Sequence, residues 1–133
     1  MTWIVTQRES FAGVADDATT AVTPISTYGN VADGPISACT LYGFQLSVSA
    51  SNSGGHSAIV RVYGEAAATY LYHESEIDLS SASDIQSVVM LTTAGTRRTA
   101  AVPLFDEPHF TIEDVGGGGG KTYTILFFIK PLE

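Results

Sequence analysis

The 133-residue sequence predicts an all-β fold, a two-sheet antiparallel β-sandwich of the jelly-roll or immunoglobulin-like type. Short runs of β-branched and aromatic residues recur along the chain, and turn residues separate them at the spacing of a sandwich. No long stretch places apolar residues at a helical period. We expect one domain covering residues 1–133, because a chain of this length buries about two thirds of its unfolded surface around one core.

The expected strands follow one another from the N-terminus. They span residues 2–7, 20–27, 40–51, 56–64, 68–75, 87–94, 99–105, 109–115 and 121–129. Turn residues at 52–55 predict a hairpin between two of these strands, and the glycines at 116–120 predict a second, terminal hairpin. Pro24 and Pro103 indicate edge strands or bulges, because proline cannot donate a hydrogen bond to a neighbouring strand.

Segment 40–51 has the clearest alternation in the chain. Tyr42, Phe44, Leu46 and Val48 alternate with glycine and polar residues. This pattern predicts a strand with one face on the core and the other toward water. The sequence does not choose between the two sandwich topologies, although the absence of a Cys…Trp…Cys spacing excludes a true immunoglobulin domain.

The segment DVGGGGGKTYT, residues 114–124, resembles a phosphate-binding loop. The phosphate-loop pattern requires a glycine where this chain has Val115, and it requires a helix after the lysine. The residues after Lys121 are β-branched and aromatic, which favours a strand. The sequence therefore predicts a glycine turn with positive φ angles and no nucleotide site.

Composition excludes several classes of partner. Charged residues make up 15% of the chain, below the roughly 25% of an average domain, and the net charge is −8. A chain this acidic, without a basic stripe, is not expected to bind nucleic acid. The N-terminal segment lacks the features of a signal peptide, no stretch has the length of a membrane span, and the single Cys39 excludes an intrachain disulfide. We therefore expect no membrane partner and no secretion, with synthesis and assembly in a cytosol.

Polar residues do not form a recognisable catalytic or metal-binding pattern. The three histidines, His56, His73 and His109, are too far apart in the sequence to suggest a zinc site. Alternate carboxylates in 73–78 could bind calcium if the segment curved, but on a straight strand they predict a solvated acidic edge. The carboxylates within 105–114 lie at strand ends, where solubilising charge is common. We expect no enzymatic activity, no cofactor and no bound metal.

The last expected strand carries apolar residues on both faces. Tyr123, Ile125, Phe127 and Ile129 fall on one face, while Leu126 and Phe128 fall on the other. One interpretation is a central strand covered by a loop. The other is a contact with a neighbouring subunit, because contiguous apolar surface marks interfaces. The candidate assembly interface consists of Trp3, Leu126 and Phe128.

The whole chain, with the ending VPLFDEPHFTIEDVGGGGGKTYTILFFIKPLE, resembles the small β-sandwich decoration (cement) proteins of tailed-phage capsids. This resemblance implies a non-enzymatic virion protein that assembles in the host cytoplasm. It also implies binding to the major capsid protein lattice as a homo-oligomer, a dimer or trimer. The class has no shared site motif, so no residue role is transferred.

The alternative is a carbohydrate- or receptor-binding β-sandwich module associated with a phage tail or fibre. Such modules present aromatic side chains on a flat sheet face. Tyr63, Tyr70 and Tyr72 are the candidates for that platform, with Tyr70 and Tyr72 expected on the same strand face.

Overall fold

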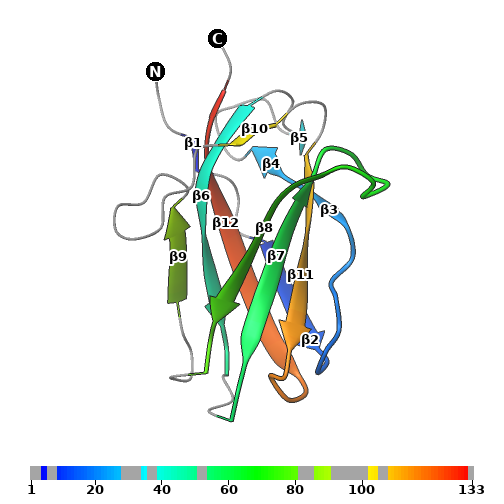
Figure 1. Cartoon of the computed structure of the whole chain (residues 1–133), viewed down its shortest axis with the longest axis vertical. Coiled ribbons are helices and arrows are strands. Elements are labelled where there is room, and N and C mark those ends of the chain that lie inside the picture. Colours follow the sequence, from blue (N-terminus) through cyan, green and yellow to red (C-terminus); the bar gives the residue numbers. More distant parts are fainter. Residues whose placement is uncertain are drawn as a thin grey trace.

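The computed structural model describes the two sheets of the molecule and several of the loops that join their strands. The described residues are 4–5, 9–27, 34–35, 39–50, 54–80, 86–90, 102–104 and 108–131. All strand pairs within this part of the chain are antiparallel. The expected all-β, two-sheet sandwich is therefore confirmed (Figure 1).

The larger sheet is built around its two longest strands, β6 and β12, which pair with each other. It contains β1 (Ile4–Val5), β2 (Glu9–Val14), β6 (Cys39–Val48), β9 (Gln86–Met90), β10 (Val102–Leu104) and β12 (Lys121–Pro131). β1 and β2 pair with different parts of β12, and β9 and β10 pair with different parts of β6. The sheet therefore has four strand positions.

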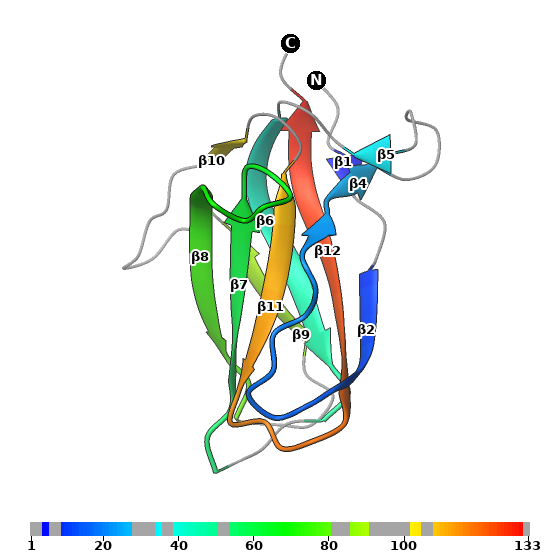
Figure 2. The ribbon, with the colours of Figure 1, turned by 90° about the vertical axis from the view of Figure 1, so that its right-hand side faces the viewer.

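The smaller sheet has the order β3-β11-β7-β8. Its strands are β3 (Thr23–Pro24), β11 (His109–Val115), β7 (Ser57–Tyr63) and β8 (Leu71–Asp78). β4 (Ser26–Thr27) and β5 (Gly34–Pro35) form a separate two-stranded pair. Figure 2 shows the smaller sheet in front of the larger one, with β8 at one edge. Pro24 lies in the edge strand β3, as the sequence predicts.

The strand order is that of a jelly roll. β1 and β2 share one position in the larger sheet, and β9 and β10 share another. Counted in this way, the first strand position of the chain pairs with the last strand, β12, and the second strand position, β3, pairs with the second-last strand, β11. β6 pairs with β9 and β10, and β7 pairs with β8. This nested pairing is produced by folding one long hairpin into two sheets, whereas an immunoglobulin sandwich pairs its first strand with its second.

Both predicted hairpins are wrong in their pairing. β6 and β7, joined through 49–56, lie in different sheets, and so do β11 and β12, joined by the glycine loop. A short turn between two apolar strands indicates that the chain reverses, but not whether the reversal stays within a sheet or crosses between sheets. Here both turns cross at the same end of the sandwich, the lower end in Figure 2.

A β-bulge changes the predicted face of one residue in β6. Phe128 lies opposite Gly43 whereas Ile129 lies opposite Leu41, so the register shifts and Tyr42 is the extra residue. Leu41, not Tyr42, therefore joins Phe44 in the buried core. The remainder of the predicted alternation in this strand is confirmed.

β2 has no counterpart among the expected strands. Its sequence, ESFAGV, contains few β-branched residues and has a glycine in the left-handed region. Pairing with β12 stabilises the segment and overrides this weak intrinsic preference. Phe11 on β2 packs against the core, with its ring centroid 5.8 Å from that of Phe110.

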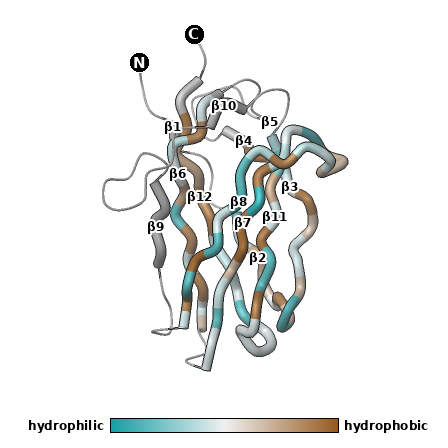
Figure 3. Tube along the Cα trace, viewed as in Figure 1, coloured by the Kyte–Doolittle hydropathy of each residue, from teal (hydrophilic) through white to brown (hydrophobic). Residues whose placement is uncertain are grey.

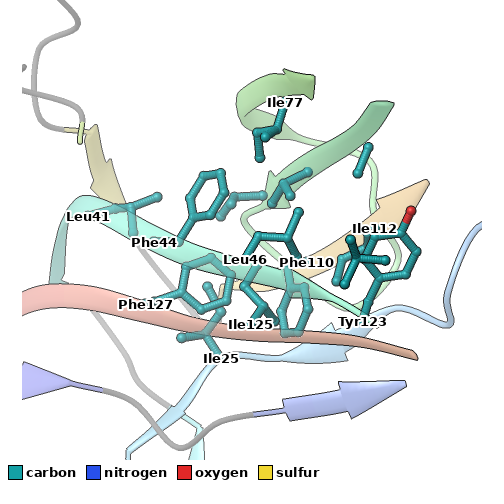
Figure 4. Close-up of a cluster of buried hydrophobic side chains, with 14 of the residues drawn as sticks. Ile25, Leu41, Phe44, Leu46, Ile77, Phe110, Ile112, Tyr123, Ile125 and Phe127 are labelled. Atoms are coloured by element: carbon teal, nitrogen blue, oxygen red, sulfur yellow. The ribbon is translucent and has the colours of Figure 1, made fainter. Parts of the chain in front are cut away.

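The hydrophobic core lies between the two sheets and draws on both of them (Figure 4). Phe127 is central, because its ring centroid lies 5.0 Å from that of Phe110 in the smaller sheet and 5.9 Å from that of Phe44 in its own sheet. Tilted and edge-to-face rings at these separations stabilise a core beyond the area that they bury. In Figure 3 the hydrophilic stretch of β8 lies beside the more hydrophobic β7.

Candidate functional site

A cluster of polar side chains closes the core at the end of the sandwich where the glycine loop lies. It contains His56, Asp114, Lys121 and Tyr123, and each of these residues is buried. His56 directly precedes β7, Asp114 lies in β11, and the other two lie in β12. Each continues the inward-facing alternation of its strand, so the cluster forms the last layer of the core.

Asp114 is the centre of this polar cluster. Its Oδ1 accepts hydrogen bonds from the Tyr123 hydroxyl and from His56 Nε2, the latter at 2.9 Å. Its Oδ2 lies 3.3 Å from Lys121 Nζ and accepts a hydrogen bond from the Asp17 amide at 3.2 Å. The side chains of Asp114 and Lys121 are 0% and 1% exposed, so this is a fully buried ion pair.

The glycine loop folds over the polar cluster and is anchored to it. Lys121 Nζ donates a hydrogen bond to the carbonyl oxygen of Gly118. Asp17 Oδ1 accepts from the Gly116 amide at 3.0 Å, which attaches the loop to the turn between β2 and β3. Gly116 has φ = 71°, and a Cβ atom on Gly117 would lie 2.5 Å from Asp114 Oδ1. The first of these positions requires a positive φ and the second requires the absence of a side chain.

The charge state of Asp114 follows from these contacts. Burial by itself raises the pKa of Asp114, but the hydrogen bonds from Tyr123 and the other donors outweigh burial and keep the pKa below its usual value. Burial, followed by the Asp114 carboxylate, raises the pKa of Tyr123 far above its usual value. Because the carboxylate only accepts, His56 Nε2 carries a proton, and Nδ1 has no hydrogen-bond partner among the described residues.

The lowered pKa of Asp114 predicts a loss of stability in acid. A carboxyl group whose pKa is lower in the folded state stabilises the fold above its unfolded pKa, near 3.9, and this contribution is lost as the pH falls through the folded value. The difference in unfolding free energy between the wild type and Asp114→Asn should therefore shrink below about pH 4. Urea unfolding of both proteins from pH 7 to pH 2.5 measures this difference. A difference that stays constant throughout the range would contradict the lowered pKa.

The contacts of the polar cluster bear on two predictions from the sequence, the glycine turn before Lys121 and the solubilising role of Asp114. The Lys121 ammonium faces the interior and pairs with Asp114, and the strand β12 begins at Lys121. A phosphate loop instead presents its lysine to the ligand at the start of a helix. The expected turn with positive φ glycines is confirmed, but Asp114 is not the solubilising charge that its position at a strand end suggests.

The outer face of the larger sheet carries no charged residue over residues 43–48 of β6 and 122–128 of β12. Thr124 and Gln45 are half-buried there, while Leu126 is only 5% exposed and lies outside the core cluster. Phe128, further along β12, is half-buried. Leu126 and Phe128 therefore share the outer face, as the sequence predicts, whereas Trp3 lies outside the described residues.

The outer face of the smaller sheet is acidic. Glu74, Glu76 and Asp78 are exposed on the edge strand β8, which confirms the predicted acidic edge. Arg61 on β7 forms ion pairs with Glu74 and Glu113, each at 2.6 Å. The described residues contain no group of three or more carboxylate, histidine or cysteine side chains arranged to bind a metal ion.

The three tyrosines of the expected sugar platform do not share one surface. Tyr70 precedes β8 and is 66% exposed. Tyr72 instead packs against the core, where its ring occupies the space that a Cβ atom on Gly64 would need. A register shift between Val62 and Tyr63 makes Tyr72 the bulged residue, so the expected sharing of one face by Tyr70 and Tyr72 is wrong.

The polar cluster was missed from the sequence, although the sequence contains a signal for it. Asp114 lies an even number of residues from Phe110 and Ile112, so the three fall on the same face of one strand. Lys121 and Ile125 fall on the same face of the next strand for the same reason. Extending the period of two to the strand ends would have placed both charges on inward faces. Opposite charges at the two ends of one glycine loop would then have indicated an ion pair.

Sequence comparisons found no relative of this chain. Within the described residues, no helix has the length and apolar character needed to cross a membrane. No model of a known protein family matches the chain, and no curated protein sequence matches it.

Proposed function

We propose that the protein is a non-enzymatic structural subunit of a phage virion, a decoration protein that binds and stabilises the major capsid protein lattice. The observation that carries the proposal is the difference between the two outer faces of the jelly roll. One face carries no charged residue over residues 43–48 of β6 and 122–128 of β12, and the other is acidic along β8. Charged residues are depleted from the centres of protein interfaces, so the uncharged face is suited to contact with another subunit.

The fold and the polar cluster support this proposal. Jelly rolls occur in viral capsid proteins and in lectins, which makes an assembly role and a sugar-binding role the two natural alternatives. His56, Asp114 and Tyr123, which are capable of acid–base chemistry, are buried and bonded to one another. Their burial supports a structural role for these three side chains.

The outer face of the larger sheet is the proposed contact between copies of the chain, in a dimer or trimer. Phe128 supplies apolar area there, and Thr124 and Gln45 supply polar contacts without charge. Leu126 is already largely buried within one subunit and contributes little further area. A stable interface removes about 1,200–2,000 Å² from water, so more of this face than one side chain must take part.

Sedimentation velocity tests the contact between copies. We expect the wild type to sediment as a dimer or trimer, and Thr124→Glu to shift it toward the monomer because the substitution places like charges in the interface. Phe128→Ser should act in the same direction. Ile59→Ser on the acidic face is the matched control for Phe128→Ser, since Ile59 is also a half-buried, outward-facing apolar residue.

Co-sedimentation with undecorated shells of the major capsid protein from the same genome tests the function itself. We expect saturable binding of the wild type and a higher temperature of shell disruption. A protein that remains in the supernatant at all concentrations is not a decoration subunit. Retention of such a protein on a glycan array would instead establish the carbohydrate- or receptor-binding alternative.

A further inference from the structure

We infer that the loop joining β7 to β8, together with the acidic edge of β8, is the surface that contacts the capsid lattice. This inference rests on the proposed function and assigns its partner-binding surface. The surface has an apolar tip, the Tyr70–Leu71 pair, followed along β8 by Glu74, Glu76 and Asp78. The matching partner is a protein surface with an apolar pocket flanked by lysine or arginine side chains.

The Tyr70–Leu71 pair is the most exposed apolar feature of the described chain. Tyr70 is 66% exposed and Leu71 is 50% exposed, and among the described residues the other exposed large apolar side chain is Val22 at 39%. Leu71 lies opposite Tyr63 on the neighbouring strand, and Tyr63 lies opposite His109. Leu71 therefore adjoins the half-buried Tyr63 on the outer face of the smaller sheet, and the next residue across the sheet, His109, is buried. Tyrosine is enriched among the residues that dominate binding at protein interfaces.

The loop that carries the pair is fixed in place before any partner binds. Glu65 Oε1 accepts hydrogen bonds from the Thr69 and Tyr70 amides at 2.7 and 2.9 Å. The Tyr70 amide is the main reason that the pKa of Glu65 lies below its usual value. Ala68 has φ = 57°, a left-handed conformation that alanine seldom adopts and that surrounding bonds must maintain. A loop ordered in this way loses little conformational entropy when it binds.

Charge identifies the partner as different from a second copy of the chain. β8 is an edge strand, and pairing two copies along it would bring the alternate carboxylates Glu74, Glu76 and Asp78 close to their own counterparts. Like charges on facing strands are destabilising, and acidic edges discourage such pairing. A partner with basic groups around the pocket instead gains attraction over the same surface.

Binding to undecorated shells of the major capsid protein, measured by co-sedimentation of the full chain, tests this assignment. We expect Tyr70→Ser/Leu71→Ser to lower the affinity about 30-fold, as for central interface residues. Val22→Ser is the matched control and should change the affinity less than about 3-fold, because Val22 is exposed near the opposite edge of the same sheet. If the double variant fails to fold, Tyr70→Ser alone is tested in its place, provided that its urea midpoint equals that of the wild type.

Salt dependence tests the acidic edge separately. Affinity of the wild type should fall between 50 and 500 mM NaCl, roughly the range over which screening of exposed charges becomes strong. Glu76→Gln/Asp78→Asn should bind more weakly at low salt and lose less affinity as salt is added, and these substitutions leave the Arg61–Glu74 ion pair intact.

The results of these binding experiments distinguish an error in the proposed surface from an error in the proposed function. If the wild type binds shells and Tyr70→Ser/Leu71→Ser binds them equally well, the surface is wrong and the proposed function stands. If the double variant loses self-association instead, the loop is a contact between copies and the inference is overturned. If the wild type fails to bind shells, both the proposed function and the inference are overturned.

Discussion

Replacing Asp114 with alanine should lower the free energy of unfolding by about 3–5 kcal/mol, the cost of breaking a buried ion pair from one side. The change leaves the Lys121 ammonium buried without its carboxylate, because the side chain is only 1% exposed. It also removes the acceptor of the Tyr123 hydroxyl and of His56 Nε2. Urea unfolding at pH 7, followed by tryptophan fluorescence and far-UV circular dichroism, measures the loss.

Two further variants separate the ion pair from a general effect of losing a carboxylate. Glu76→Ala removes an exposed carboxylate of the smaller sheet and should cost less than about 1 kcal/mol. Adding Lys121→Met to Asp114→Ala should restore part of the loss, because no unpaired charge then remains in the core. Equal losses for Asp114→Ala and Glu76→Ala would show that the Asp114 side chain is not buried in an ion pair.

Truncating Phe44 to alanine should lower the free energy of unfolding by about 3–5 kcal/mol, the usual cost of removing a core phenylalanine. Phe44 is fully buried and its ring is in contact range of Phe127, which in turn contacts the opposite sheet. The cavity would therefore lie at the junction of the two sheets, where neighbouring strands cannot close it by a local shift. The denaturant midpoint should fall while the m-value stays unchanged.

Ser47→Ala is the control for Phe44→Ala, because Ser47 faces outward on the same strand. It should change the unfolding free energy by less than about 1 kcal/mol. A second comparison tests the bulge, since Leu41→Ala should cost about 2–5 kcal/mol. A small effect of Leu41→Ala would restore Tyr42 to the core and contradict the register shift in β6.

Sequence alternation predicted the core because burial on one sheet face directly selects apolar residues at every second position. Phe44, Leu46 and the inward face of β12 were found in this way. The method failed where the period is interrupted. The bulges at Tyr42 and Tyr72 insert one residue each, and nothing in the local sequence determines which residue is inserted.

Pairing between strands could not be predicted for a different reason. The turns after β6 and β11 have ordinary turn composition, yet both carry the chain from one sheet to the other. Which strand lies beside which depends on the packing of the whole sandwich, to which a turn contributes little. β2 shows the same limit, because its strand conformation comes from β12 and not from its own residues.

Charge alone does not predict the polar cluster, because charged residues at strand ends usually face water. Asp114 and Lys121 are exceptions, since each neutralises the other inside the core. A search for opposite charges with inward parity at both ends of a loop would have identified them. Their burial is consistent with the low tolerance of the interior for an unpaired charge.

The pairing of β2 with β12 has a consequence for how the protein is made. Ser10 lies opposite Thr124, so residues 114 positions apart in the chain become neighbours. β6 likewise gains its central partner only when β12 is available. Domains dominated by such distant contacts fold slowly, because loop closure precedes the contacts that stabilise the loop. Until β12 has left the ribosome, β6 retains an unpaired apolar edge, and at about 5–20 residues per second this interval lasts several seconds. The nascent chain therefore exposes this edge of β6 until the central pair of strands can form.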